Sequence, residues 1–434
     1  MKISGWGKNT VSECKIVKPK TLSGLKKEIV KNCIARGMGR SYGDSSIQPN
    51  KTIVMTNFSK VIKFDHIKGI IKVEAGITLL DLLKVIVPKR WFVPVSPGTK
   101  FVTIGGMIAS NVHGKNHHKT GGFENHLIEI KVIDENKMTR KCSIKKEKAF
   151  FLGTCGGMGL TGIIIEATIK LKKIETSYIE ERIYCTKNME DTIKQIEKSN
   201  KYHYSIAWVD CAANNHNFGR GVIFCGEHVK KNFLPKNANK LNVKKKKKFN
   251  VFFSLPKFIF NSFFIRIFNI LYYYTNYLKK NVSYVDYDKF FYPLDSLLNW
   301  NNLYGNNGFI QYQCVVPKKK DIIKILKIFK YSDIKSFLVT VKILKKDKGL
   351  LSFPMKGYTL AFDVPHSKKN SILINQLNKQ LLKSKGKIYL AKDSLMKASF
   401  FRSTYKGLNK FKKTIRNKKN TQIFTSMQSR RLEL

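Results

Sequence analysis

The sequence predicts an α+β fold of two domains, with the second domain inserted into the first. Three glycine clusters fall within about 130 residues of the N-terminal half, each beside runs that alternate as strands do. From about Ile174 the clusters stop and longer strand and helix signals take over, until polar residues typical of a site return at Tyr389–Asp393. We therefore expect a first domain over 1–175, an inserted domain over 176–386 and a return to the first domain over 387–434.

Composition places the chain among globular proteins, with 434 residues, 43% hydrophobic residues and 12% aromatic residues. The formal net charge of +52 raises the question of nucleic-acid binding. Lysines are spread along the whole chain, and Asn, Ile, Phe and Tyr are also abundant, which is typical of A/T-rich coding. We expect no specific nucleic-acid partner, whereas attraction to an anionic membrane or a phosphorylated substrate stays open.

The eight cysteines show no C-x-x-C pair and no clustered spacing. This argues against a metal site and a disulfide scaffold, and it favours a reducing compartment. Residues 1–10 contain no apolar stretch of the kind found in secretory signals. We expect a cytoplasmic protein, peripheral on the inner face of the plasma membrane if it contacts lipid.

The regular elements of the first domain can be read from periodicity and turn residues. We expect a helix over 22–34 that runs into a strand at Cys33–Ala35, paired strands at Ile53–Phe64 and Gly69–Glu74, and an amphipathic helix at Leu79–Val87. We also expect a hairpin that turns at 135–137 between Leu127–Asp134 and Met138–Ile144, and a further strand at Ile163–Leu171. A basic helix and tail are expected at Gln428–Leu434.

The first glycine cluster, R-G-M-G-R-S-Y-G-D-S-S over 36–46, comes directly after the strand at Cys33–Ala35. Backbone N–H groups of such a loop can turn onto a pyrophosphate. The glycine spacing is not G-x-G-x-x-G, and no G-K-[ST] closes the loop, so neither a Rossmann fingerprint nor a Walker loop is present. Taken alone, the loop is equally well explained as an ordinary glycine turn.

The central segment, Pro97–Gly122, holds six glycines and three histidines in 26 residues. Small residues in its first half let a flat group come close to the backbone, and polar residues that titrate or donate fill its second half. We interpret this segment as the cradle of a flavin. The third cluster, T-C-G-G-M-G-L-T-G over 154–162, strengthens a dinucleotide interpretation that no single loop would support.

A basic and aromatic stretch over 244–278 stands apart from these clusters. It opens with Lys244–Lys248 and continues with aromatic and aliphatic residues that Pro256, Lys257 and Arg266 interrupt, so it is too broken to span a bilayer. The pattern fits an interfacial membrane contact and fits equally a buried helix pair beside a solvated basic loop.

Taken together and in this order, the clusters resemble those of FAD-linked oxidases of the vanillyl-alcohol-oxidase superfamily, and more narrowly the decaprenylphosphoryl-β-D-ribose oxidase family. The matching motifs are R-G-M-G-R-S-Y-G-D at 36–44, P-G-T at 97–99, V-T-I-G-G at 102–106, H-G-K-N-H-H at 113–118, G-G-M-G-L-T-G-I-I at 156–164, G-F-I-Q-Y-Q at 308–313, L-S-F-P at 351–354, Y-L-A-K-D-S at 389–394 and the terminal R-R-L-E-L. The likeness covers nearly the whole chain.

The resemblance implies the two-domain FAD-binding fold of that superfamily, with an inserted substrate domain, and FAD as the cofactor. The residues it assigns to the cofactor are Ala35, Arg36, Gly37, Met38, Gly39, Arg40, Ser41, Tyr42, Gly43, Asp44, Ser45, Gly98, Thr103, Ile104, Gly105, Gly106, Ser110, Asn111, Val112, His113, Ile164 and Tyr389. Arg40 stands where covalent members often carry the flavin-linking histidine, so we expect the FAD to be bound non-covalently.

The resemblance also assigns residues around the sugar and the isoalloxazine, which are Tyr42, His113, Lys115, Gln311, Gln313, Lys342 and Lys392. A desolvated Lys392 can act as a base or stabilise an alkoxide. His113 can hold the hydroxyl or stabilise the charge of the reduced flavin, and the sequence does not separate these roles. For His117, His118 and His126 we expect a structural role.

The chain departs from the family pattern at Gly357-Tyr358-Thr359-Leu360-Ala361. The mycobacterial-type oxidase has an asparagine where this chain has Thr359 and a cysteine where it has Ala361. A hydride mechanism does not require that cysteine, so the reaction class is unaffected. The shape and polarity of the sugar pocket change, which leaves the substrate open.

From the resemblance we expect FAD-dependent oxidation of the 2′-hydroxyl of a polyprenyl-phosphoryl-β-D-ribose, with an NAD(P)H-dependent short-chain reductase completing an epimerisation to the arabinose form. One alternative is an aldonolactone or other sugar-alcohol oxidase of the same superfamily that acts on a soluble substrate. Another is a basic binding protein that has kept the flavin fold without catalysis. The set of His113, Lys115 and Lys392 argues against the second alternative.

Overall fold

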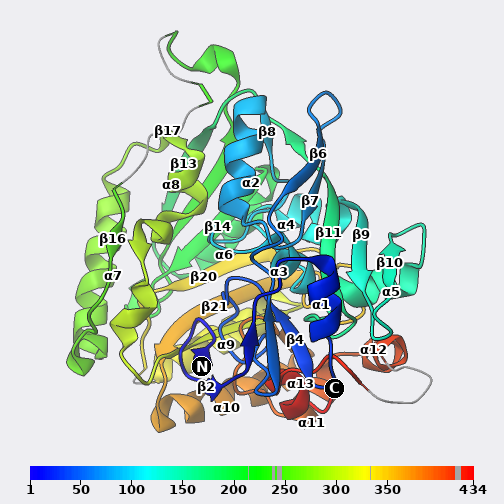
Figure 1. Ribbon diagram of the computed structural model, residues 1–434. Helices are drawn as coiled ribbons and strands as arrows, with labels where there is room; N and C mark the ends of the chain where they lie inside the picture. The colour runs from blue at the N-terminus through cyan, green and yellow to red at the C-terminus, as the bar shows by residue number, and fades with distance from the viewer. Residues whose placement is uncertain (214, 237–239, 242–246, 333, 416–421) are drawn as a thin grey trace.

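Mostly antiparallel sheets and separate helices build the computed structural model, an α+β arrangement that describes residues 1–434 except 214, 237–239, 242–246, 333 and 416–421 (Figure 1). The N-terminal part forms a small parallel sheet and a larger antiparallel one. The parallel sheet has the order β3 (Ile16–Val17), β5 (Lys51–Val54), β4 (Cys33–Arg36). The antiparallel sheet has the order β10 (Thr139–Cys142), β9 (Leu127–Ile133), β11 (Ile163–Lys170), β7 (Ile70–Glu74), β6 (Val61–Asp65).

The structure confirms the hairpin of β9 and β10, the strand β11 and the amphipathic helix α2 (Leu79–Ile86), whose buried leucines and isoleucine lie on one face. Two expectations were wrong. The first helix, α1 (Leu22–Glu28), ends well before β4. The expected strand over Ile53–Phe64 is split between β5 and β6 in two different sheets, because Phe58 N donates to Met55 O (3.0 Å) and closes a turn between them.

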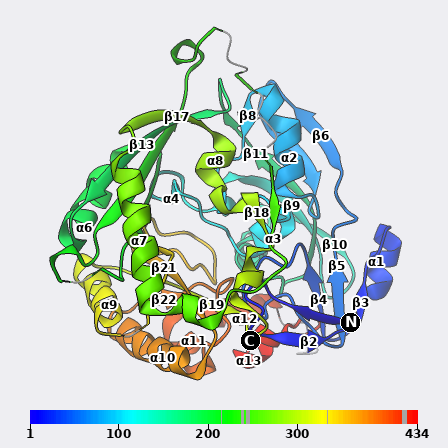
Figure 2. The same ribbon diagram turned by 90° about the vertical axis from the view of Figure 1, so that its left-hand side faces the viewer.

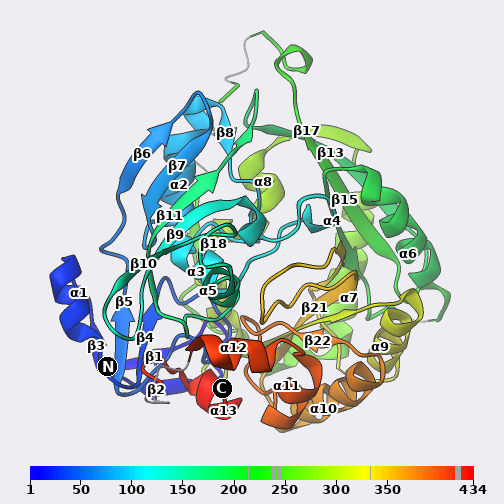
Figure 3. The ribbon, with the colours of Figure 1, turned by 90° about the vertical axis from the view of Figure 1, so that its right-hand side faces the viewer.

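An eight-stranded antiparallel sheet dominates the second half of the chain (Figures 2 and 3). Its order is β17 (Val282–Asp286), β13 (Tyr178–Thr186), β15 (Gly221–His228), β14 (Tyr204–Val209), β20 (Val339–Leu344), β21 (Gly357–Pro365), β19 (Phe309–Val316), β22 (Lys387–Ile388). One face packs on α6 (Met189–Lys198), α9 (Lys319–Tyr331) and α10 (Lys368–Lys383). At its β13–β15 end, the opposite face is covered by α7 (Ser262–Tyr277), whose Tyr273 packs on Trp208 and Val222.

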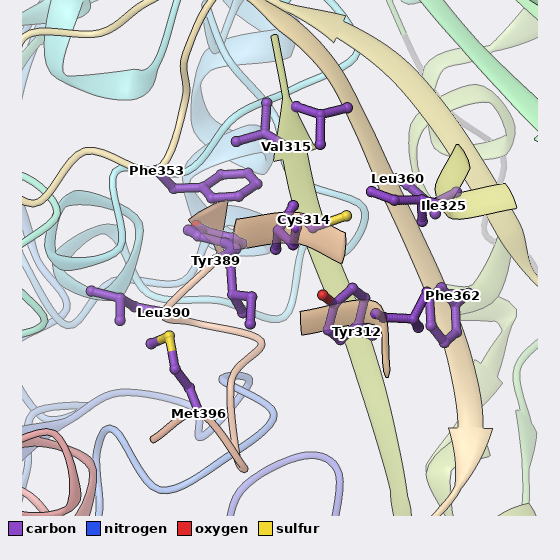
Figure 4. Packing of buried hydrophobic residues seen from close by; sticks show 14 of the residues in the cluster. Tyr312, Cys314, Val315, Ile325, Phe353, Leu360, Phe362, Tyr389, Leu390 and Met396 are labelled. Carbon is purple, nitrogen blue, oxygen red and sulfur yellow. The ribbon is translucent and has the colours of Figure 1, made fainter. Parts of the chain in front are cut away.

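Side-chain alternation along β19 sorts its residues between these two faces. Tyr312 and Cys314 point into the core with Phe362 and Ile325 (Figure 4). Because successive strand residues point to opposite faces, Gln311 and Gln313 point away from these helices. The sheet therefore presents polar side chains on the face that it shares with α7.

The remaining elements connect these sheets and close the molecule. The short strands are β1 (Lys2–Ser4), β2 (Val11–Glu13), β8 (Trp91–Phe92), β12 (Lys172–Lys173), β16 (Phe249–Asn250) and β18 (Leu297–Leu298). The other helices are α3 (Ile104–Ala109), α4 (His117–Thr120), α5 (Lys148–Thr154), α8 (Tyr287–Phe291), α11 (Ala398–Thr404), α12 (Leu408–Ile415) and α13 (Met427–Arg431). The C-terminal end returns to the N-terminal sheets, where Phe424 bridges Cys33 and Met427 N donates to Ile47 O (2.8 Å).

The basic and aromatic stretch is only partly described, since residues 244–246 of the lysine run lie outside the described residues. Beyond that run the stretch forms one long helix, α7, with a largely exposed outer face, and the buried helix pair that we kept as an alternative is wrong. No helix in the described ranges is long and apolar enough to cross a membrane.

Candidate active site

A cavity of about 530 Å³ brings the glycine clusters together with the polar face of the eight-stranded sheet. The predicted cofactor residues that line it are Ala35, Arg36, Gly37, Met38, Gly39, Arg40, Ser41, Tyr42, Ser45, Gly98, Thr103, Gly105, Gly106, Ser110, Val112, His113, Ile164 and Tyr389. All four predicted substrate residues line it as well, namely Gln311, Gln313, Lys342 and Lys392. Segments far apart in sequence thus meet at one site.

Five predicted site residues lie behind the cavity wall rather than on it. Gly43 packs against the chain at Asp393, where a Cβ would lie 2.0 Å from the Asp393 carbonyl oxygen. Asp44 pairs with Arg431, and Ile104 lies in the core. Asn111 accepts from Glu124 N and donates to Asp347. The ammonium of Lys115 turns to the Phe290 carbonyl oxygen.

Sequence reasoning missed one wall of the cavity, which is formed by Trp6 and by residues 294–300 around β18. Leu294, Leu297, Leu298 and Trp300 give this wall an apolar character. No motif marks these residues, because tertiary contacts alone bring them to the site.

The loop over 36–46 has the donors that a pyrophosphate requires. Within the described contacts, Tyr42 N donates to Ala391 O (2.9 Å), and it is the only backbone amide of residues 38–46 that donates to another group of the chain. The amides of the residues in this range that line the cavity, Met38–Ser41, Ser45 and Ser46, are therefore available to an anion. Gly39 has φ +62°, and a Cβ there would collide with Arg36, whose guanidinium holds the loop through Ser4 O (2.6 Å) and Ser46.

The cradle segment leaves room for a flat ring. Among the described residues, and apart from the adjoining backbone, no atom lies within 4 Å of where a Cβ of residue 98 would stand. For a Cβ built on Gly106, the one such neighbour is Thr103 Oγ1 at 3.2 Å. Side chains at these glycines would fill the cavity. The donor loop and this open cradle together fit the two ends of FAD.

A chain of hydrogen bonds fixes the histidine of the site. Thr359 Oγ1 donates its one hydrogen to Cys314 O (2.8 Å), so it accepts from Gln313 Nε2 at 3.2 Å. The amide nitrogen of Gln313 therefore also faces His113 Nε2, which accepts at 2.9 Å. A neutral imidazole with an accepting Nε2 carries its proton on Nδ1, and Nδ1 lies 3.3 Å from Lys342 Nζ.

Burial and charge keep this histidine neutral. Desolvation, with help from the nearby Lys342 ammonium, holds the pKa of His113 well below its usual value. Burial lowers the pKa of Lys342 to about 8, so Lys342 gives up a proton, and can then accept from His113 Nδ1–H, more readily than an exposed lysine does.

Lys392 lines the other side of the cavity, and the buried Asp363 lies behind the lining residue Gln311. Lys392 Nζ lies 3.6 Å from the centre of the Tyr42 ring, and Gln311 Nε2 donates to Asp363 Oδ1 at 2.6 Å. Burial lowers the pKa of Lys392 to about 7, although the Asp363 carboxylate opposes the shift, and burial raises the pKa of Asp363 to about 7. Neither group holds its charge firmly at neutral pH, so the pair can take up or release a proton.

The histidines that we expected to be structural do not line the cavity. His117 Nε2 pairs with Asp347 at 3.0 Å and His117 Nδ1 accepts from Lys345 N at 3.0 Å, while His118 Nε2 bonds Tyr202 O at 2.8 Å. His126 is half-buried outside the cavity lining. At the position where the chain departs from the family, Ala361 lines the cavity, and Thr359 acts from behind it through Gln313.

Comparison with known proteins agrees with this geometry. Residues 27–143 match the family of FAD binding domains. The whole chain is 30% identical to decaprenylphosphoryl-β-D-ribose oxidase of Mycolicibacterium smegmatis, covering 97% of that enzyme. It is also 25% identical to an uncharacterised Streptomyces coelicolor protein in the mprA 5′ region, over 82% of this chain and 100% of that one, and 26% identical to D-lactate dehydrogenase of Anaerostipes hadrus, over 37% and 35%.

The cavity, the glycine loop that lines it and the matched domain define an FAD-dependent oxidoreductase with the FAD-binding fold of the vanillyl-alcohol-oxidase superfamily. FAD is its cofactor. More narrowly, the chain belongs to the family of FAD-linked oxidases that includes decaprenylphosphoryl-β-D-ribose oxidase.

Proposed function

We propose that the protein oxidises the 2′-hydroxyl of a polyprenyl-phosphoryl-β-D-ribose to the 2-keto sugar. The observation that carries this proposal is the full-length similarity to an enzyme of that name, combined with a cavity that holds polar and titratable side chains beside an FAD site. A separate NAD(P)H-dependent short-chain reductase would return the keto sugar to the arabinose form and so complete an epimerisation.

In the proposed reaction the carbinol C–H and O–H bonds break and a C=O bond forms. Bound FAD supplies the two-electron acceptor for the hydride. The hydroxyl proton needs a base of the chain within reach as the hydride leaves. We assign that role to Lys392 acting with Asp363, because burial brings the pKa of each group to about 7 and Lys392 lines the cavity.

The remaining polar residues orient the sugar. His113 stays neutral and contacts Gln313 through Nε2 and Lys342 through Nδ1, so it holds these two cavity-lining side chains in position beside the sugar. Gln311 holds Asp363 in place, and the ring of Tyr42 covers the ammonium of Lys392. Their burial keeps water away from the reacting atoms.

The direct test is anaerobic reduction of the purified holoenzyme. We expect polyprenyl-phosphoryl ribose to bleach the visible absorption band of the oxidised flavin, with the 2-keto sugar recovered after the reaction. A yellow protein that this substrate leaves unchanged, and that a soluble aldonolactone or sugar alcohol bleaches, would overturn the proposed substrate. In that case Thr359 and Ala361 have redirected the pocket.

A further inference from the structure

An exposed aromatic surface covers α7 and the segment before it. Of the eight exposed phenylalanines in the described part of the chain, seven lie in this region. The aromatic surface consists of Phe249, Phe252, Phe253, Phe258, Phe263, Phe264, Ile267, Phe268, Ile270, Leu271, Tyr274, Tyr277 and Leu278. A contiguous apolar patch of this kind marks an interaction site on a soluble fold.

Helix α7 has the reverse of the usual polarity of a surface helix, with polar side chains facing the sheet and apolar side chains facing outward. Its buried side chains are Ile265, Asn269, Tyr273 and Asn276, whose spacing places them on one stripe facing the sheet. The polar members of the stripe point inward, and Asn269 Nδ2 donates to the buried Asp210 Oδ1 at 2.9 Å. The outward arc carries the aromatic and aliphatic side chains instead, which is an arrangement suited to an apolar surrounding.

The outward arc carries no charged side chain. Between Phe258 and Leu278 the sequence has one charged residue, Arg266, in a chain with 25% charged residues. The guanidinium of Arg266 is half-buried and donates to Ala212 O at 3.1 Å. Exposed lysines stand at both ends of the surface, Lys247 and Lys248 before it and Lys279 and Lys280 after it.

Two partners could cover the aromatic surface, a lipid bilayer or a second copy of the chain, and the charge around the surface favours the bilayer. A second copy would bring its own +52 charge and the same flanking lysines to the contact. An anionic membrane surface offers the opposite charge beside an apolar interior. With 16 residues α7 is too short to span a bilayer, so it would lie in the plane of the interface.

The aromatic surface continues into the wall of the cavity. Strand β16 pairs in parallel with β18, whose Leu297 and Leu298 line the cavity. Further along, Phe260 stacks on Tyr304 at 4.8 Å between ring centres, and Tyr304 stacks on Phe309 at 4.4 Å. The ring of Phe309 packs on the cavity residue Tyr42 at 5.4 Å.

A lysine of the basic run also reaches this wall, since Lys248 Nζ lies 5.2 Å from the ring of the cavity residue Phe101.

From these observations we infer that the aromatic surface docks the protein on a bilayer that contains anionic lipid, with α7 flat in the interface and its flanking lysines among the headgroups. The cavity wall then lies beside the membrane. This deepens the proposed function in one respect, because the polyprenyl chain of the substrate would stay in the bilayer while the sugar enters the cavity. The docking itself does not depend on which sugar is oxidised.

The test is flotation of the full-length FAD-loaded protein with vesicles of phosphatidylcholine, with and without phosphatidylglycerol. We expect binding to the anionic vesicles that weakens as salt is raised. The combined substitutions Phe263→Ser, Leu271→Ser and Tyr277→Ser should lower binding at least about a hundredfold, since each apolar side chain withdrawn from lipid costs about a factor of ten. These side chains are 61–63% exposed, so the fold should tolerate their replacement.

The matched control replaces three apolar side chains elsewhere that are at least as exposed, at 63–82%, by Ile67→Ser, Met138→Ser and Tyr331→Ser, and it should bind as the wild type does. Flavin absorbance and thermal unfolding verify that both variants remain folded. Binding that the first variant retains would overturn the proposal. A concentration-dependent dimer that only the first variant abolishes would assign the surface to a second copy instead.

Vesicle binding needs no sugar, and flavin reduction in detergent needs no vesicle. Failure of the docking proposal and failure of the proposed function can therefore be told apart.

Discussion

The side-chain amide nitrogen of Gln313 lies 2.9 Å from Nε2 of His113, at the wall of the cavity. Because of this contact, the orientation of the Gln313 amide determines which nitrogen of the His113 imidazole carries the proton. Thr359 fixes that orientation, because its hydroxyl hydrogen is already donated to Cys314 O and only its lone pair is left for Gln313. A residue behind the wall thereby sets the tautomer of His113 and the orientation of the Gln313 amide at the cavity wall.

Replacing Thr359 by Val removes the acceptor and frees the Gln313 amide to turn its oxygen toward His113. We expect the rate of flavin reduction by substrate to fall about tenfold, which corresponds to one hydrogen bond lost in the transition state. Thr359→Ser keeps the hydroxyl and should retain most of the rate. The measurement is stopped-flow flavin reduction at saturating substrate, and equal rates for Val and wild type would contradict the assigned role.

Lys392 and Asp363 predict how the rate depends on pH. If neutral Lys392 takes the hydroxyl proton, the rate of flavin reduction rises with pH through about 7, where burial has moved its pKa, and then levels off. The Asp363 carboxylate favours the ammonium and so raises the pKa of Lys392. Asp363→Asn should therefore move the midpoint of the profile to lower pH.

Lys392→Met tests the same role by removing the base, and we expect a loss of at least about a hundredfold in the reduction rate with FAD still bound. A profile that falls as pH rises through about 7 would instead assign Lys392 as an ammonium that stabilises the developing alkoxide.

The position of Arg40 predicts how the cofactor is held. Arg40 lines the cavity and its guanidinium lies 4.0 Å from the ring centre of Trp6, and it has no nucleophilic nitrogen free to link the flavin. We expect acid precipitation of the yellow protein to release all of its flavin into the supernatant as FAD. Flavin that stays with the precipitate and fluoresces on a denaturing gel would show a covalent link elsewhere in the cradle.

Sequence patterns predicted the glycine loops and the segment around Tyr389, and the structure brings them together although more than two hundred residues separate them. The sequence could predict these segments because their small residues and the order of their motifs indicate a close approach of the backbone to a ligand. Asp363 could not be predicted, since it meets the site only through the pairing of β19 and β21 that sets Gln311 opposite it. Lys115 is the opposite case, a residue that its motif assigned to the site. Its ammonium turns to the Phe290 carbonyl oxygen, which the motif could not show.

Helix α7 shows a second limit of sequence reasoning. Its residues are hydrophobic on most sides, so periodicity alone does not tell a buried helix from an interfacial one. The decisive fact is that Asn269 faces inward to Asp210, and this contact depends on a strand far from α7 in the sequence.

Arg431, at the end of α13, ties the glycine loop over 36–46 to the segment that carries Lys392. Its guanidinium donates to both oxygens of Asp44 (2.8 and 3.1 Å) and to Asp393 Oδ2 (2.9 Å), and both carboxylates are buried. Arg431→Met leaves two buried carboxylates without their cation, which should lower the free energy of unfolding by about 3 kcal/mol. FAD affinity should fall as well, because Asp44 anchors the loop over 36–46, most of whose residues line the cavity.

Urea unfolding and flavin titration of the same variant measure these two effects. Arg402→Met is the matched control, since Arg402 pairs with Glu433 at the surface, where both side chains are about half exposed or more. Its loss should change the unfolding free energy by less than about 1 kcal/mol and leave FAD affinity unchanged. If both variants lose the same stability, the C-terminal contact acts only as a surface ion pair. If Arg431→Met loses stability but keeps its FAD affinity, the loop holds its shape without Asp44 being anchored.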